Sequence, residues 1–328
     1  MKKVNKHTTL AVSALILLMT ACTAQSLDAA PIATEPAAYA PNPQENPVAQ
    51  INLPGERSNH AGDYDSSALA HKKLVSSGDY FTAGEYERPF NANTMDVYYP
   101  NIDIVDTTVY QDDIWIFGVI QVKELKNTDG QYALELDIDV DGYGDYLIRV
   151  SNPSSEDWSN AGSQIFEDAN NDVGNKKAVI SDKDASGDGF ETLVFDADGG
   201  IGSDAARARI SPDEPNTIEI AVLREAVGNP ERYLINMWAG SAILDPSLFD
   251  INDHYTHEQA GAANTGYELY YPIKQVAEID NTCRMAVGFA PNGSEPGLCQ
   301  QPKTVDDSGP AEVPVPPQGA NNPPTSRD

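Results

Sequence analysis

The sequence predicts an all-β protein, an antiparallel β-sandwich with jelly-roll or immunoglobulin-like layers. One reason is a series of short segments rich in β-branched and aromatic residues, of which 114–122 (IWIFGVIQV) is the clearest. A second is that turn residues separate these segments, while no long stretch shows helical periodicity. The candidate strands are 103–110, 114–122, 132–137, 146–150, 164–167, 192–196, 206–210, 217–223, 233–239, 268–273 and 276–279.

Both ends of the chain have compositions that predict little packing. Residues 23–63 are rich in Ala, Pro, Asn and Gln, and residues 300–328 are rich in Pro, Ser and Asn. Such segments bury too little apolar surface to offset the entropy lost on ordering them. We therefore expect a disordered tether at 23–63, one β-sandwich domain at 64–299 and a disordered tail at 300–328.

Residues 1–22 have the pattern of a signal peptide. Lys2, Lys3 and Lys6 precede an apolar run at 10–19. The run continues into Met-Thr-Ala-Cys22, which resembles a bacterial lipobox, with Met where Leu is commonest. The resemblance implies export, cleavage before Cys22 and lipidation of that residue. The lipid would anchor the protein to the outside of the cytoplasmic membrane or to the outer membrane, at the cell surface; an ordinary signal peptide with an accidental cysteine is the alternative.

The charge of the chain is strongly negative. It has 50 Asp plus Glu against 21 Lys plus Arg, a net charge of −29 at pH 7. Such a chain should repel nucleic acid, so no nucleic-acid partner is expected, and it should attract divalent cations. The alternative is that the acidic surface only keeps an exported protein soluble.

Two cysteines remain after Cys22. Cys283 and Cys299 enclose a loop that contains Pro291, Gly293 and Pro296, so the loop has little structure of its own. In an exported chain two available thiols favour a disulfide, which would stabilise the fold by roughly 3 kcal/mol for a loop of this length. A metal or catalytic role for the pair is the weaker alternative.

The most specific motif is the aspartate-rich stretch DIDVDGYGD. Asp137, Asp139 and Asp141 alternate with other residues, Gly142 follows them, and Asp145 comes three residues later. Carboxylates at this spacing, on a loop that turns at a glycine, can converge on one hard cation. We therefore expect Ca²⁺ as the cofactor.

The motif resembles the first half of an EF-hand or dockerin calcium loop. It departs from that pattern at the twelfth position, where Ile148 stands in place of the bidentate Glu, and in having no flanking helices. Apolar segments at 132–136 and 146–150 instead predict a hairpin clamped by metal. The alternative is an acidic hairpin turn without an ion.

Two further loops repeat the pattern less completely. Their candidate metal ligands are Asp184, Ser186 and Asp188 in one loop and Asp168, Asn170 and Asp172 in the other. Serine is a poor ligand in the first loop, and Val173 takes the place of the glycine in the second. The stretch 196–204 resembles a single unit of a nonapeptide calcium repeat, although such units work in tandem. For all three stretches an ordinary turn is the alternative.

The sequence shows no established catalytic motif. It has no Gly-x-Ser-x-Gly elbow, no His-Glu-x-x-His and no phosphate-binding glycine loop. A secreted hydrolase with an unrecognised carboxylate site remains the alternative to a binding or structural protein. Trp158, in the polar segment 154–163, is the candidate for an aromatic side chain that stacks on a ligand, with packing over the sheet as the alternative.

Residues 102–122 resemble the opening of family 9 carbohydrate-binding and DOMON-type β-sandwiches. The resemblance lies in the Asp-punctuated first strand and the turn into Ile-Trp-Ile-Phe-Gly-Val, and the closing stretch 280–299 looks like the end of uncharacterised bacterial exported proteins. The resemblance of residues 102–122 implies a sandwich, with a polysaccharide as a candidate partner, but it assigns no ligand residues and no haem. We expect a lipid-anchored, calcium-binding cell-surface protein with a binding or structural role, glycan recognition being one form of that role.

Overall fold

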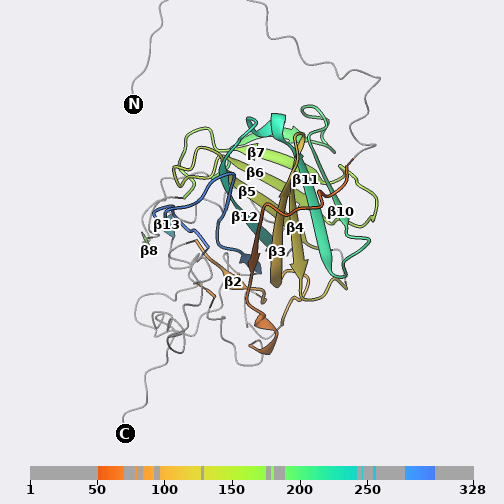
Figure 1. Ribbon diagram of the computed structural model, residues 1–328. Coiled ribbons are helices and arrows are strands. Elements are labelled where there is room, and N and C mark those ends of the chain that lie inside the picture. The colour runs from red at the N-terminus through yellow and green to blue at the C-terminus, as the bar shows by residue number, and fades with distance from the viewer. Residues whose placement is uncertain are drawn as a thin grey trace, which may run out of the picture. The chain divides into compact units, whose positions relative to one another are not determined.

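The computed structural model describes residues 51–69, 78–79, 84–91, 97–126, 129–174, 179–180, 189–241, 246, 254–255 and 278–299. Within these residues the protein is all-β, with two antiparallel sheets of five and eight strands packed face to face (Figure 1). The predicted fold class, an antiparallel β-sandwich, is therefore confirmed. No helix in the described part of the chain is long and apolar enough to span a membrane.

The five-stranded sheet has the order β1-β3-β4-β11-β10. Its strands are β1 (Asn59–Gly62), β3 (Ile104–Gln111), β4 (Trp115–Val122), β10 (Ala206–Ile210) and β11 (Thr217–Leu223). The strand β4 lies at its centre, where the hairpin β3–β4 meets β11. This central place agrees with the strongly β-forming sequence of the strand.

The eight-stranded sheet has the order β2-β14-β12-β5-β6-β7-β9, and β15 also pairs with β12. Its strands are β2 (Glu87–Arg88), β5 (Gln131–Asp137), β6 (Tyr146–Ser151), β7 (Ser163–Glu167), β9 (Thr192–Asp196), β12 (Tyr233–Gly240), β14 (Ile279–Asn281) and β15 (Met285–Val287). A short parallel pair, β8 (Val179–Ile180) with β13 (His254–Tyr255), and two 3₁₀ turns, η2 (Ser66–Ala68) and η5 (Arg224–Val227), complete the described elements.

The core lies between the two sheets. Ile116 and Ile120 of β4 and Leu134 and Leu136 of β5 are fully buried in one apolar cluster. The sheets approach so closely at Gly118 that a Cβ there would lie 2.2 Å from Leu134 Cδ2. A side chain at this position would therefore clash with the buried side chain of Leu134, because packed interiors leave little room for an added carbon.

The outer face of the five-stranded sheet is also covered. Trp115, Phe117 and Ala221 form a second buried cluster with Ile51, from the N-terminal end of the described chain. Ile51 and the strand β1, which pairs with β3, both lie inside the range 23–63, which we expected to be a disordered tether. The folded domain thus begins before residue 64, because this segment covers an apolar sheet face and extends a sheet edge.

The expected strands from 103–110 through 233–239 each correspond to an observed strand, within one or two residues at the ends. The expected strand 268–273 lies outside the described residues, as do all but the last two residues of 276–279. The structure adds β14 and β15, which flank the disulfide-bonded Cys283 and add to β12. These strands are only three residues long, too short for an alternation to be recognised in the sequence.

Candidate metal centre

The aspartate-rich stretch connects β5 to β6. These strands form an antiparallel hairpin in which Leu136 pairs with Tyr146, and Asp137 is the last residue of β5. The side chain of Asp137 is buried, with 1% of its surface exposed. The motif therefore sits in a loop between two strands, as the flanking apolar segments predicted.

The carboxylate of Asp137 organises the loop around itself. Its Oδ1 accepts hydrogen bonds from the backbone N–H of Val140 at 2.6 Å and of Asp141 at 3.2 Å, and its Oδ2 accepts from Gly142 N–H at 2.9 Å. The turn requires positive φ at Val140 (65°) and Gly142 (100°). Positive φ is costly for a β-branched residue, so the contacts of Asp137 hold a strained backbone in place.

Three of the four predicted ligands in this loop converge. One carboxylate oxygen of each of Asp137, Asp139 and Asp145 lies within 4.8 Å of the other two. Asp145 Oδ2 also accepts a hydrogen bond from Ile138 N–H at 2.6 Å, which fixes its direction. The fourth, Asp141, instead accepts from Tyr143 N–H at 2.9 Å and from Asn171 Nδ2 at 3.0 Å. The converging group is therefore Asp137, Asp139 and Asp145.

Burial makes two members of this group, Asp137 and Asp145, costly to ionise. Removal from water raises the pKa of Asp137 to about 6, against the lowering effects of Arg284 and of the backbone donors Gly142 and Val140. Burial likewise raises the pKa of Asp145 to about 6, and repulsion from Asp139 adds to that rise. A cation among these oxygens would offset both effects, since opposite charge favours the ionised form.

Arg284 supplies part of the positive charge from within the protein. Its guanidinium donates to Glu135 Oε1 and to the carbonyl oxygen of Gly142, both at 2.7 Å, and lies 3.6 Å from Asp137 Oδ2. The Cys283–Cys299 disulfide, with Cα atoms 4.9 Å apart, holds the adjacent backbone. Arg284 therefore supports the carboxyl end of β5 and at the same time reduces the negative charge that the loop offers to an ion.

The predicted loop at Asp168 lies beside the first. Asp168 accepts hydrogen bonds from the backbone N–H groups of Asn170 (3.2 Å), Asn171 (2.8 Å), Asp172 (2.9 Å) and Val173 (2.9 Å). The carboxylate thus closes its own turn, in which Asn170 and Asp172 contribute backbone donors. Gly144 N–H donates to Val173 O at 2.7 Å, so the two loops are joined and support each other.

Of the remaining predicted site residues, Asp184, Ser186 and Asp188 lie outside the described part of the chain, as does Cys22. In the stretch 196–204, Asp196 Oδ1 accepts from the N–H of Asp198 and of Gly199, at 3.1 and 2.9 Å. That geometry is an Asx turn, in which the side chain imitates a backbone acceptor.

Trp158 packs against the five-stranded sheet. Its ring lies 6.1 Å from the ring of Phe117, and the guanidinium of Arg209 lies 4.6 Å from its centre. The indole is partly buried in this position. Trp158 therefore contributes to the layer that covers the outer face of β4.

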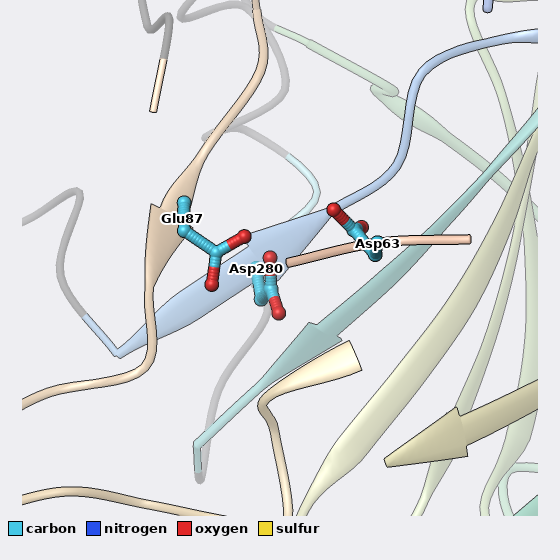
Figure 2. A group of neighbouring side chains, drawn as sticks. All are labelled: Asp63, Glu87 and Asp280. Carbon is cyan, nitrogen blue, oxygen red and sulfur yellow. The ribbon is translucent and has the colours of Figure 1, made fainter. Parts of the chain in front are cut away.

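The structure also brings together three acidic residues that the sequence did not single out. Asp63, Glu87 and Asp280 each place one carboxylate oxygen within 4.8 Å of the other two (Figure 2). They are far apart in the chain and share no motif, so no local pattern could have found them. Comparison of the chain with protein-family models, curated proteins and solved structures finds no match.

Proposed function

We propose that this protein is an exported, calcium-binding β-sandwich with a binding or structural role at the cell surface. The observation that supports the proposal most directly is the convergence of Asp137, Asp139 and Asp145 in the β5–β6 loop. All three offer oxygen only, which suits hard cations, and calcium accepts the irregular geometry of a loop better than magnesium does. The ion would join the ends of two strands and stabilise the hairpin.

The affinity for calcium should be modest. Three carboxylates contribute, and Arg284, 3.6 Å from Asp137 Oδ2, opposes the charge of the ion. We expect a dissociation constant of about 10⁻⁴ to 10⁻³ M, the range typical of extracellular calcium modules. This range agrees with an exported protein, as does the Cys283–Cys299 disulfide, which favours an oxidising compartment.

Glycan recognition is the finer form of the proposed role. It rests on the resemblance of residues 102–122 to family 9 carbohydrate-binding and DOMON-type sandwiches, and the two-sheet fold is compatible with it. A glycan array with the full-length chain, in calcium and in chelator, tests this proposal. Hydrolysis of arrayed polysaccharides would instead favour the hydrolase alternative.

The calcium proposal predicts a shift in thermal stability that depends on Asp139. At tenfold excess over the dissociation constant, binding to the folded state alone contributes about 1.4 kcal/mol, or roughly 3–6 °C for a domain of this size. The calcium-induced shift of the Asp139→Asn variant should be smaller than that of the wild type by about this amount, because the substitution removes one of the converging charges while Asp137 keeps its turn. The measurement is thermal melting in calcium and in chelator.

A matched control is Asp213→Asn, which removes one exposed carboxylate from a turn outside the loop. This variant should keep the full calcium shift. Equal shifts in Asp139→Asn and Asp213→Asn would contradict the calcium proposal and indicate that the Asp137 loop is an ordinary acidic turn.

A further inference from the structure

Asp63, Glu87 and Asp280 come from both layers of the sandwich. Asp63 directly follows β1, and its N–H donates to Val105 O of β3, in the five-stranded sheet. Glu87 lies on β2 and Asp280 on β14, in the eight-stranded sheet. Figure 2 shows the side chains of Glu87 and Asp280 directed toward each other from their strands, with Asp63 beside them. We call these three residues the inter-sheet cluster.

Strand register places two of the negative charges opposite each other. Asp280 pairs directly with Glu87 in the antiparallel pair β14–β2. Like charges at directly opposed positions of two strands destabilise a sheet. This arrangement would be tolerated at low cost if positive charge lay between the two carboxylates.

Hydrogen bonds satisfy only part of the cluster. Asp280 Oδ2 accepts from Ile104 N–H at 2.6 Å, Glu87 Oε1 accepts from Ser66 Oγ at 2.6 Å, and Asp63 Oδ1 accepts from Tyr64 N–H at 2.8 Å. The second oxygens of Asp280 (Oδ1) and Asp63 (Oδ2) are buried and have no hydrogen-bond partner among the described residues. Asp280 as a whole is 0% exposed. A buried carboxylate oxygen without a partner is costly, and such groups call for an explanation.

Among the described residues, no basic side chain forms an ion pair with the cluster. Arg88, the neighbour of Glu87, has its guanidinium on Asp79, with Nε 2.5 Å from Oδ1. Lys123 pairs with Asp65. Within this part of the chain no basic side chain would therefore compensate the inter-sheet cluster in its ionised form.

The cost appears in the acid–base equilibria. Burial is the largest effect and raises the pKa of Asp63, of Glu87 and of Asp280, and repulsion from neighbouring acids raises them further. These carboxylates must hold either protons or a cation. Protons alone would satisfy the cluster only at a pH low enough to keep the carboxyl groups neutral.

We propose that Asp63, Glu87 and Asp280 form a buried site for a hard divalent cation that joins the two sheets. All donors are carboxylate oxygens, which suit calcium, magnesium or manganese and not soft metals. Their mutual separations, within 4.8 Å, fit one calcium coordination sphere, in which oxygens at ~2.3–2.6 Å from the ion lie at most about 5 Å apart. Magnesium demands near-ideal octahedral geometry at ~2.1 Å and gives up its waters reluctantly, so it suits a cluster of three carboxylates less well.

The two proposed sites should differ in affinity. No described basic side chain opposes an ion in the inter-sheet cluster, whereas Arg284 lies beside Asp137 in the loop. The inter-sheet cluster should therefore bind calcium more tightly than the β5–β6 loop, and a mild chelator should strip the loop first.

The experiment measures calcium bound per chain by equilibrium dialysis of the full-length protein, with magnesium as a second probe. Asp280→Asn should lose one tightly bound equivalent, because the amide keeps an acceptor for Ile104 N–H and removes the charge. Asp63→Asn is the second variant, in case Asp280→Asn does not fold, and should lose the same equivalent. Asp139→Asn is the matched control and should retain this tight equivalent.

The outcomes separate this inference from the proposed function. Loss of the tight equivalent in Asp63→Asn or Asp280→Asn, with retention in Asp139→Asn, supports the inter-sheet site whatever the β5–β6 loop does. Unchanged calcium binding in a folded Asp63→Asn or Asp280→Asn protein would overturn the inference and indicate that the cluster holds protons alone. Equal uptake of magnesium would support the site but contradict its preference for calcium.

Discussion

Two buried carboxylates, Asp137 at the end of β5 and Asp280 in the middle of β14, have opposite surroundings. Asp137 is surrounded by three backbone N–H donors and has Arg284 nearby. In the part of the chain that the structure describes, Asp280 accepts one backbone hydrogen bond, from Ile104 N–H, and its other oxygen has no hydrogen-bond partner. Because only the second carboxylate lacks compensation, a cation should matter more to the folded state at Asp280 than at Asp137.

Asp103 lies next to the inter-sheet cluster and shows how buried acids set the pH dependence. Burial raises its pKa to about 6 from an ordinary 3.8, although hydrogen bonds from Tyr98 and from Ser66 N–H lower it. The charged groups around it are Asp65, Lys123, Asp63, Glu87 and Asp280. The folded state therefore binds a proton at Asp103 more tightly than the unfolded chain does.

The sign of the resulting prediction follows from this difference. The contribution of Asp103 to stability is fully present below pH ~4 and is lost as the pH rises through about 6. In chelator, Asp103→Asn should thus gain stability relative to the wild type between pH 4.5 and pH 7, by at most about 3 kcal/mol. Melting temperatures of both proteins across this range provide the measurement, and parallel curves would contradict the prediction.

At the scale of elements, the segment 278–299 connects the parts of the candidate metal centre. Its strands β14 and β15 both pair with β12, and Arg284 lies between them. Arg284 N–H donates to Gly297 O and its carbonyl accepts from Cys299 N–H, both at 2.8 Å. The disulfide therefore closes a loop that includes Arg284, the residue that contacts Glu135, Gly142 and Asp137.

Loss of this disulfide should destabilise the domain. Cys283 and Cys299 are 16 residues apart in sequence, and opening a loop of this length costs roughly 3 kcal/mol in the chain-entropy account. Urea denaturation of the Cys283→Ser/Cys299→Ser variant should show this loss as a lower midpoint. A reducing agent should lower the midpoint of the wild type and leave that of the variant unchanged; equal midpoints for the two oxidised proteins would contradict the role of the disulfide.

At the scale of the whole molecule, the acidic composition agrees with the proposal of a lipid-anchored protein that works outside the cytoplasm. The net charge of −29 would keep it soluble and concentrate divalent cations near its surface. If the protein is exported as proposed, this charge would favour the supply of calcium to both proposed sites. The anchor itself rests on the sequence before Cys22.

The anchor predicts a change in fractionation. Expressed in a bacterium, the wild-type protein should partition with membranes, because two or more acyl chains give stable anchoring. The Cys22→Ser variant should be exported without a lipid and recovered in the soluble fraction. Equal amounts of soluble protein with the same processing in both cases would show that Cys22 is not lipidated.

Local features of the sequence predicted much of this protein. The strands of five to eight residues were predicted because alternation and β-branched composition can be recognised over that length, and the shorter strands were missed. The hairpin at Asp137 was found because a single loop carries the aspartates and the glycine that turns it. The Cys283–Cys299 pair followed from there being two available thiols in a chain predicted to be exported.

The tertiary structure alone decided which of these groups meet. An Asx turn and a metal loop use the same residues, so only the fold shows that Asp168 closes its own turn while Asp139 joins Asp137 and Asp145. The contacts of Arg284 and the meeting of Asp63, Glu87 and Asp280 depend on pairings between distant strands. Such contacts are set by the packing of two sheets, which leaves no periodic trace in the sequence.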